Sequence, residues 1–523
     1  MIPEFTANSE LKDVIIIGGG PAGLAVASRL SERMPAATFT DEEHQRYHWI
    51  RKHARKMSIK TTGRAPRGGG ALLDLTVLDA TGDEWMKRWH TLFRTFDISH
   101  LRSPMFFHID PAEQDGLLSY AHMNGRGKEL REICGCVGKE VSKHQRKKRG
   151  RGSIDERDRN DYFVPSTPLF SAHCNCLIDR YSLRRDVIQH EEVLDIRYGF
   201  VDHACRDDPV FTIRTNKTTR YARVAVLAVG PANSPTIPGP IDQGGDDAIT
   251  HAMKIRTFPS TRVKERIASK KATNILIVGG GLTSAQLADL AIRRGVSKVW
   301  LIMRGELKVK PFDVGLEWVG KFRNFEQAAF WSADTDEERW EKIKAARNGG
   351  SITSPYRKIV EKHVASGKLT LCRHTTLRSR QWQESTQTWK VELDGLDRDQ
   401  KQDEDHEAVL PLFDHIYYAT GVQTDFTTLP YLQNLLADYP VASCGWTPLH
   451  HGRHAVEGGS LQLGPGAPNL VGARIGAERT SWAVQDILDK AHGVVGGSSK
   501  QSDGCFDYST ARGSRYSALD IDI

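Results

Sequence analysis

Short apolar runs that lead into glycine-rich turns are the clearest pattern along this chain. Residues 13–17 (DVIII) predict a buried strand, and the turn at 18–23 (GGGPAG) leads into an amphipathic segment with helical spacing. The same order recurs at 274–278 (NILIV) and 279–284 (GGGLTS). The sequence therefore predicts two strand–turn–helix units of the same kind, one near the N-terminus and one in the middle of the chain.

Turns of this kind bind the diphosphate of a dinucleotide. The first glycine permits the sharp bend, the second lets the backbone approach the phosphates, and the third position lets the helix pack closely on the strand. The helix N-terminus supplies free N–H groups and the positive end of the helix dipole. The predicted cofactor contacts are Gly18, Gly20, Pro21, Ala22 and Gly23 in the first turn, and Gly279, Gly281, Leu282, Thr283 and Ser284 in the second.

The residue that ends the next strand predicts which dinucleotide the first unit binds. Residues 36–40 (AATFT) have the pattern of a strand that ends at Asp41. An acid at this position accepts hydrogen bonds from ribose hydroxyl groups, which fits FAD. Glu42 and Glu43 follow directly and are alternatives in a shifted register.

In the second unit, residues 298–303 (KVWLIM) predict the corresponding strand, and Arg304 follows it. No acid stands where it would repel a 2′-phosphate, and a guanidinium binds that phosphate with charge-assisted hydrogen bonds. Arg304 therefore favours NADPH over NADH. Lys308 and Lys310 are alternatives for this role, and Arg304 also fits an ordinary surface position after a strand.

Two further apolar runs that end in glycine predict the strands on which the chain crosses between the units. They occupy 224–230 (VAVLAVG) and 415–421 (HIYYATG), so Thr420 and Gly421 are expected to touch a cofactor. The predicted fold is α/β, with two Rossmann-like domains and the NADPH-binding domain inserted into the FAD-binding domain. The expected bounds are 1–235 and 410–491 for the two parts of the FAD-binding domain, 236–409 for the NADPH-binding domain, and 492–523 for a flexible tail.

Composition excludes several other classes of protein. Of the 523 residues, 39% are hydrophobic and 26% are charged, as in globular proteins. No stretch reaches the roughly 18 apolar residues of a membrane span, and the N-terminus lacks the pattern of a secretory signal. A cytoplasmic protein is therefore expected. Among the eight cysteines, the close pairs are both of the C-x-C type, so reduced thiols and no metal site are expected.

The net charge of +7 depends partly on one basic run at 143–152 (KHQRKKRGRG). Such a run fits either a nucleic-acid patch or a solvated insertion loop. The loop is favoured because acidic residues follow directly and no aromatic residues are interleaved, so no nucleic-acid partner is expected. Three stretches rich in glycine, serine or charge are expected to be poorly ordered, at 62–70, about 138–161 and from about 493.

These motifs resemble the class B flavin-dependent monooxygenases, which include the flavin-containing monooxygenases, the Baeyer–Villiger enzymes and the ornithine and lysine N-hydroxylases. The resemblance covers most of residues 12–490. Its motifs are GGGPAG at 18–23, GGGLTS at 279–284, ATG at 419–421 and SLQLGPGAPNLVGAR at 460–474. The stretches DEEHQRYHWIRKH, ISHLRSPMFFH and LKVKPFDVGLEWVGKFRN look most like the oxidative stress-induced growth inhibitor proteins.

One motif of this superfamily is degraded here. Of the pattern F-x-G-x-x-x-H between the two units, only Ile249, Thr250 and His251 survive, without the preceding aromatic residue and glycine. This departure argues against the Baeyer–Villiger and flavin-containing subgroups and leaves the general architecture intact.

The resemblance implies FAD, NADPH and O2 acting on a small-molecule substrate. A C4a-hydroperoxyflavin would insert one oxygen atom, with N-hydroxylation among the reactions. The residues agree, because a disulfide reductase would need a C-x-x-C pair near the flavin and this chain has none. Two alternatives stay open: an NADPH oxidase or dehydrogenase without oxygen insertion, and a regulatory flavoprotein without turnover.

No catalytic side chain stands out, and two candidates each have a structural alternative. His251 either orients the nicotinamide or belongs to a linker, which we favour. Asn469 precedes a helical pattern at 475–488 and either lies near the flavin or is an ordinary helix cap. Gly464 and Gly472 in the same segment are predicted cofactor contacts. The loop at 101–105 (LRSPM) is a candidate for the substrate side of the flavin.

Overall fold

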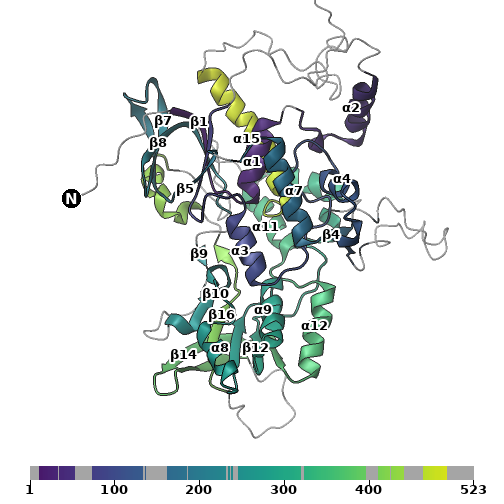
Figure 1. Ribbon diagram of the computed structural model, residues 1–523, viewed down its shortest axis with the longest axis vertical. Coiled ribbons are helices and arrows are strands. Elements are labelled where there is room, and N and C mark those ends of the chain that lie inside the picture. The colour runs from purple at the N-terminus through teal and green to yellow at the C-terminus, as the bar shows by residue number, and fades with distance from the viewer. Residues whose placement is uncertain are drawn as a thin grey trace, which may run out of the picture.

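The computed structural model describes most of the chain between residues 11 and 491. The described ranges are 11–32, 34–53, 73–133, 136, 159, 162–184, 186–230, 234–235, 237–238, 246–319, 323–395, 410–423, 426–440 and 463–491. The basic run and the three stretches expected to be poorly ordered lie outside these residues, apart from Arg159. Figure 1 shows two lobes, each built around one β-sheet.

The first sheet has the strand order β5-β2-β1-β8-β7-β6. Strands β5, β2, β1 and β8 run parallel, and β7 and β6 continue the sheet in antiparallel pairing. The strand bounds are β1 (Leu11–Ile17), β2 (Leu75–Asp79), β5 (Ile188–His190), β6 (Val193–Val201), β7 (Cys205–Thr215) and β8 (Thr219–Leu227).

The second sheet is parallel throughout, with the order β10-β16-β11-β12-β13. Its strands are β10 (Ile249–His251), β11 (Asn274–Val278), β12 (Lys298–Ile302), β13 (Leu369–Cys372) and β16 (His415–Tyr418). Two small hairpin sheets accompany the two lobes, formed by β3 (Leu130–Glu132) with β4 (Phe163–Pro165) and by β14 (Thr376–Gln383) with β15 (Thr388–Asp394). The predicted α/β fold with two Rossmann-like units is confirmed.

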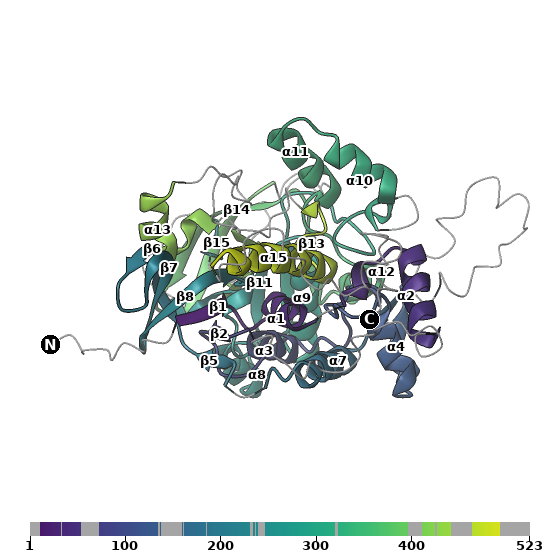
Figure 2. The ribbon, with the colours of Figure 1, turned by 90° about the horizontal axis from the view of Figure 1, so that it is seen from above.

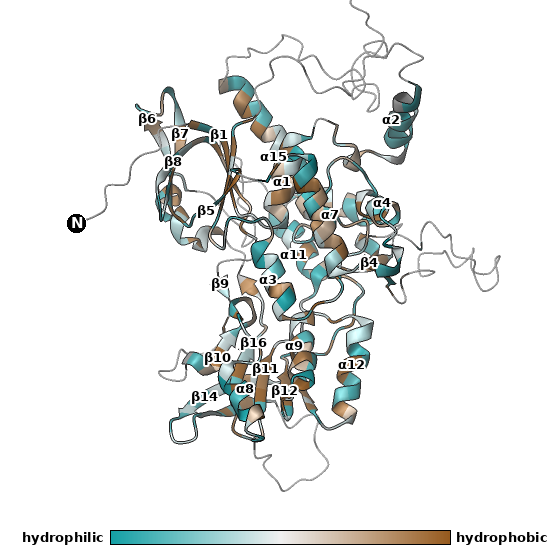
Figure 3. Ribbon diagram, in the orientation of Figure 1, coloured by the Kyte–Doolittle hydropathy of each residue, from teal (hydrophilic) through white to brown (hydrophobic). Residues whose placement is uncertain are grey.

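Alternating side chains of the central strands pack into separate cores on the two faces of each sheet. Val14 and Ile16 of β1 face the helices of the first lobe, whereas Ile15 and Ile17 face the opposite cluster. In β11, Ile277 packs towards the helices and Leu276 towards the β14–β15 hairpin. Figure 3 shows β11 as hydrophobic and α2 as mainly hydrophilic. Strands buried on both faces explain the unbroken apolar runs in the sequence.

Helices α1 and α15 lie side by side on the first sheet, as Figures 1 and 2 both show. Arg29 of α1 forms a bidentate ion pair with Glu478 of α15, which ties the C-terminal helix to the first lobe. The helix bounds are α1 (Pro21–Ser31), α2 (Asp41–His53), α3 (Lys87–Thr95), α4 (Gly116–Met123), α7 (Thr167–Arg180), α8 (Thr261–Ala268), α9 (Leu282–Arg293), α10 (Arg323–Trp331), α11 (Asp336–Arg347), α12 (Ser354–Ala365), α13 (Gln433–Asp438) and α15 (Leu470–Ala491).

The chain crosses between the lobes on two short segments that pair with each other. β9 (Ser234–Pro235) follows β8, β17 (Val422–Gln423) follows β16, and the two are antiparallel neighbours. The second sheet is thus inserted between β8 and the C-terminal helix of the first lobe. Because β16 lies inside the second sheet, that lobe extends beyond the boundary expected at residue 409.

One expected strand is absent from the described structure. Residues 36–40 do not form the second strand of the first sheet, because Ala36–Thr38 is a short 3-10 helix and α2 follows. The strand that takes the expected place beside β1 is β2, which pairs with β1 in parallel from Val14 with Leu75 to Ile17 with Leu78. In the part of the chain that the structure describes, we find no helix with the length and apolar character needed to cross a membrane.

Candidate active site

The first glycine-rich turn is closed towards the protein and open towards solvent. Gly18 has φ +115°, and a Cβ atom there would lie 2.5 Å from the carbonyl oxygen of Ala228. A Cβ atom on Gly23 would lie 1.9 Å from the oxygen of Gly18, so α1 packs directly on the turn. A Cβ atom added to Gly20 would have no other atom within 4 Å. Backbone thus fills the inner side, and room remains in front of the outer glycine.

The N-terminus of α1 faces this room without a side-chain cap. Gly20 is the N-cap residue and Pro21, which has no N–H group, begins the helix next to Ala22. Some of the described helices do have a side-chain cap, for example α7, which is capped by Ser166, and α11, which is capped by Thr335. The first-turn N–H groups and the helix dipole therefore remain for an anionic ligand.

Asp79, at the end of β2, is the acid that lies beside this turn. Its Oδ2 atom accepts a hydrogen bond of 2.7 Å from the backbone N–H of Gly19, and its Oδ1 atom accepts one from Thr81. Asp79 thus occupies the end of the strand beside β1, which is the position expected for Asp41 from the sequence. Asp41 is instead the first residue of α2, and Glu42 is exposed on that helix.

The sequence carried the signal for Asp79. Residues 75–79 (LTVLD) are an apolar run that ends in an acid, like the runs before both glycine turns. The segment between α1 and β2 is longer than in the simplest βαβ unit, and a fixed spacing of about 20 residues pointed to Asp41, which begins α2 and does not end a strand. Glu43 has a local role, because its carboxylate accepts a hydrogen bond of 2.7 Å from the Thr40 N–H group.

The second glycine-rich turn repeats the geometry with one difference. Gly279 has φ +145°, and a Cβ atom there would lie 2.4 Å from the carbonyl oxygen of Ala419. Ser284 is buried in the place of the third glycine, and its hydroxyl donates a hydrogen bond of 2.6 Å to the oxygen of Gly281. Gly281 is the N-cap residue of α9, which begins at Leu282 and Thr283 and has no side-chain cap. This helix also offers its N–H groups to an anion.

Arg304 is exposed directly after β12, where a 2′-phosphate on the ribose would be expected. The two alternative cations are engaged elsewhere. Lys308 donates to the side chain and carbonyl of Asn348, and Lys310 donates to the carbonyl oxygens of Ala346 and Arg347. These contacts favour Arg304 over both lysines as the phosphate-binding residue.

The loop after α11 crosses the second turn. A Cβ atom on Gly350 would lie 3.0 Å from the Cα atom and 3.1 Å from the nitrogen of Gly281. The next residue, Ser351, accepts a hydrogen bond of 2.8 Å from Arg102 at its hydroxyl oxygen. Arg102 belongs to the other lobe, so this loop is held between the two lobes directly at the turn.

Arg102 is therefore occupied in joining the lobes rather than in lining a substrate surface. Its guanidinium also donates to the carbonyl oxygens of Lys310 and Phe312. Carbonyl oxygens converging on one guanidinium satisfy its fork of donors, which a lysine could not do. Arg102 belongs to the loop that was expected to line the substrate side, and its contacts position the two lobes relative to each other.

His251 braces the crossover between the lobes. Its Nε2–H group donates a hydrogen bond of 2.9 Å to the carbonyl oxygen of Gly421, and its Nδ1 atom accepts one of 3.2 Å from Met253. The side chain is buried, and burial lowers its pKa, so the ring is neutral near pH 7. Gly421 has φ +85°, and it follows Thr420 where the chain leaves the second sheet. These contacts agree with the linker reading of this histidine.

Asn469 caps the N-terminus of α15. Its Oδ1 atom accepts hydrogen bonds of 3.1 Å from the N–H groups of Val471 and Gly472, while its Nδ2 atom is buried and has no hydrogen-bond partner among the described residues. A Cβ atom on Gly472 would lie 2.2 Å from the oxygen of Ala467, so the preceding loop folds back on the helix. This loop begins near Gly464, which has φ +80°.

A buried polar cluster that sequence patterns did not reveal lies below this helix end. The guanidinium of Arg474 lies 3.0 Å from Nε2 of His108, and Nε2 of His108 lies 2.8 Å from the carbonyl oxygen of Gln114. Burial lowers the pKa of Arg474 to about 10, and burial beside Arg474 lowers that of His108 well below its ordinary value. Arg474 therefore remains charged near pH 7, and His108 remains neutral.

Asp110 supplies negative charge to the same cluster. Both of its carboxylate oxygens accept hydrogen bonds of 3.0 Å from Arg180. Burial raises the pKa of Asp110, but the nearby ring of His173, whose Nε2 atom lies 3.5 Å from Oδ2, and the charge of Arg180 together hold that pKa well below its ordinary range. The cluster thus fixes a charged arginine near the start of α15.

Comparison with known proteins finds one matching family model. The family model described as L-lysine 6-monooxygenase/L-ornithine 5-monooxygenase matches residues 183–424, which include the second sheet and both crossover segments. A search of curated proteins found no match.

Solved structures share the fold over most of the chain. Ornithine hydroxylase from Pseudomonas aeruginosa is 17% identical with a TM-score of 0.57, and the match covers 91% of this chain and 100% of that one. The ornithine N-hydroxylase of Kutzneria sp. 744 is 16% identical with a TM-score of 0.60, covering 92% and 100%. The cadaverine monooxygenase of Erwinia amylovora is 16% identical with a TM-score of 0.56, covering 91% and 95%.

The family match and the shared fold agree with the class expected from the sequence. Over residues 183–424 the chain is similar to the L-lysine 6-monooxygenase/L-ornithine 5-monooxygenase family, and flavin-dependent monooxygenase activity is the function that these matches support. The resemblance to the growth inhibitor proteins rests on sequence stretches alone.

Proposed function

We propose that this enzyme hydroxylates the amino group of a small primary amine, with FAD at the first glycine-rich turn, NADPH at the second, and O2 as oxidant. The observation that carries the proposal is the match over residues 183–424 to the L-lysine 6-monooxygenase/L-ornithine 5-monooxygenase family, which is named for its substrates lysine and ornithine. The solved relatives named above are two ornithine hydroxylases and a cadaverine monooxygenase, so an amine at the end of a flexible chain is the shared feature of their substrates.

In this proposal the first turn and its neighbours hold FAD. The open side of Gly20 and the uncapped N-terminus of α1 bind the diphosphate, and Asp79 accepts hydrogen bonds from the ribose. The charged Arg474 places positive potential near the start of α15, which favours negative charge on the flavin.

The second turn and Arg304 hold NADPH. The uncapped N-terminus of α9 binds the diphosphate, and Arg304 binds the 2′-phosphate. When bound, the two cofactors supply hydride transfer and oxygen activation. The chain orients the nicotinamide towards the flavin and excludes water, and the hydrogen bonds of Arg102 and His251 fix the lobes for that purpose.

The test separates amine hydroxylation from its alternatives. Purified protein loaded with FAD is mixed with NADPH in aerated buffer containing ornithine, lysine or cadaverine, and flavin absorbance, peroxide and hydroxylamine are followed. We expect flavin reduction, and hydroxylamine formed in proportion to the NADPH consumed with at least one amine. If peroxide accounts for all the NADPH with every amine, the enzyme is an oxidase towards these compounds and the amine proposal is wrong. An FAD-loaded protein that NADPH never reduces contradicts the whole assignment and favours the regulatory alternative.

A further inference from the structure

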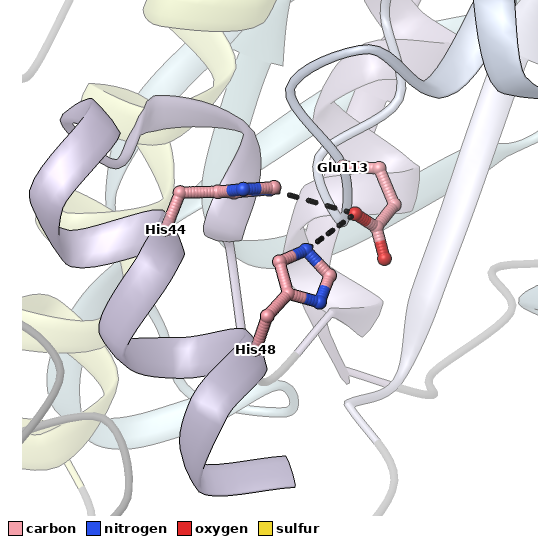
Figure 4. A group of neighbouring side chains, drawn as sticks. All are labelled: His44, His48 and Glu113. Atoms are coloured by element: carbon pink, nitrogen blue, oxygen red, sulfur yellow. Dashed lines mark ion pairs between the residues drawn. The ribbon is translucent and has the colours of Figure 1, made fainter. Parts of the chain in front are cut away.

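A cluster of two histidines and one glutamate lies on α2, outside the dinucleotide sites. His44 and His48 are separated by one helical turn, so both imidazoles project from one side of α2, and their ring centroids are 4.4 Å apart. Glu113 reaches them from the loop before α4, as Figure 4 shows. Figures 1 and 2 both place α2 at the periphery of the molecule, near α4.

The spacing of the three side chains fits one metal ion. The Oε2 atom of Glu113 lies 3.6 Å from Nε2 of His44 and 3.9 Å from Nε2 of His48. One ligand atom from each side chain lies within 4.8 Å of the other two. Zinc bonds of about 2.0–2.2 Å in a tetrahedron place ligand atoms roughly 3.4 Å apart. The cluster therefore needs only small side-chain movements to coordinate an ion.

A second observation also indicates a ligand. The Nε2 atom of His44 is buried, yet it has no hydrogen-bond partner among the described residues. A buried polar atom without a partner costs about 1–3 kcal/mol, and coordination to an ion would remove that cost. The side chain of His48 is 48% exposed, so an ion and a water ligand have access from solvent.

We propose that His44, His48 and Glu113 bind a divalent cation of the zinc class, with water in the fourth position. Two imidazoles and one carboxylate are a ligand set that zinc uses, whereas magnesium and calcium prefer oxygen atoms. This proposal departs from the expectation that the chain has no metal site. The spacing H-x-x-x-H was visible in the sequence, but Glu113 is distant in the chain and only the fold brings it to the two histidines.

The bound ion would join α2 to the loop that supports the buried arginine cluster. The same loop contains His108 and Asp110, which contact Arg474 and Arg180, and it ends at Gln114, whose carbonyl oxygen contacts His108. A cation at Glu113 would thus fix α2 against a segment that reaches the start of α15. The proposed role is to stabilise this side of the first lobe, and it does not depend on the proposed reaction.

Metal content and thermal stability test the proposal without measuring activity. The FAD-loaded protein, with FAD content checked, is dialysed against buffered Zn²⁺ or Mg²⁺, and bound metal and melting temperature are measured. We expect one tightly bound zinc per chain that raises the melting temperature, and no such effect of Mg²⁺. X-ray absorption at the zinc edge should show only nitrogen and oxygen ligands.

Variants locate the site. His48→Ala should lose this zinc and its thermal shift, and Glu113→Gln should weaken both, while each variant keeps the stability of the zinc-free protein. His53→Ala, on the same helix, and His122→Ala, exposed on α4, are matched controls that should bind zinc normally. Equal zinc content and thermal shift in His48→Ala and the unmodified protein would overturn the proposal. Sulfur ligands in the absorption spectrum would overturn it as well, because they would place the zinc at cysteines.

Discussion

The two glycine-rich turns begin with the same three residues and then differ in three ways. In the first, glycine fills the third position, an acid ends the neighbouring strand, and the outer glycine faces open space. In the second, a serine fills the third position, Arg304 follows the neighbouring strand, and Gly350 of a crossing loop approaches the outer glycine. In the proposed assignment, one backbone device therefore serves two different dinucleotides, because the residues around it decide the charge and the room that each ligand meets.

The largest effect should follow from Gly23→Ala. The added Cβ atom would lie 1.9 Å from the backbone oxygen of Gly18, and neither helix nor turn can move away without losing the pocket. We expect purified protein without FAD and a loss of more than about 4 kcal/mol in unfolding free energy. The ratio of FAD to protein and a denaturant melt measure this. Normal FAD content in Gly23→Ala would contradict the close packing of α1 on the turn.

Asp79→Asn should weaken FAD binding about 10- to 150-fold, because hydrogen bonds to a charged group contribute about 1.5–3 kcal/mol. The dissociation constant can be measured by flavin fluorescence after removal and re-addition of FAD. Asp41→Asn and Glu42→Gln are the matched controls and should bind FAD as the unmodified protein does. A stronger effect at residue 41 than at residue 79 would restore the original sequence-based assignment.

Arg304→Asp tests the charge difference between the turns. We expect KM for NADPH to rise about 10- to 100-fold and KM for NADH to change little, because an acid repels the 2′-phosphate that the arginine binds. Lys308→Ala should leave the preference almost unchanged, since that lysine is bound to Asn348. An unaltered ratio of the two KM values in Arg304→Asp would exclude this arginine as the phosphate-binding residue.

Arg102→Ala should loosen the loop that crosses the second turn. Its hydrogen bonds to Phe312 and Ser351 join the lobes, and their loss should cost about 1–3 kcal/mol. We expect a several-fold rise in KM for NADPH with an unchanged flavin spectrum, whereas Arg94→Ala, at an exposed position on α3, should change neither. A general loss of stability with normal NADPH kinetics would assign Arg102 a purely structural role.

Ser284→Ala should have the smallest effect. It removes one hydrogen bond to the oxygen of Gly281, which contributes about 1 kcal/mol, and leaves the backbone of the turn in place. The apparent Kd for NADPH, measured by stopped-flow reduction of the flavin, should change by no more than about fivefold. An effect as large as that of Gly23→Ala would mean that the third positions of the two turns have the same role.

The sequence by itself determined the two nucleotide-binding units, their order and the crossover strands. Local rules suffice there, because residues 13–23 and 274–284 form strand, turn and helix start from contiguous residues. The same rules placed Arg304 directly after its strand. A contiguous motif can be recognised when every residue that forms it is adjacent in the chain.

Only the tertiary structure decided which distant residues meet these units. Asp79 lies beside Gly19 because β2 pairs with β1, and the long segment between α1 and β2 made counting unreliable. Arg102 reaches Ser351 across the lobes, and Arg474 meets His108 inside the first lobe. Such contacts depend on strand pairing and helix packing, which bring together side chains that no periodicity or spacing along the chain relates.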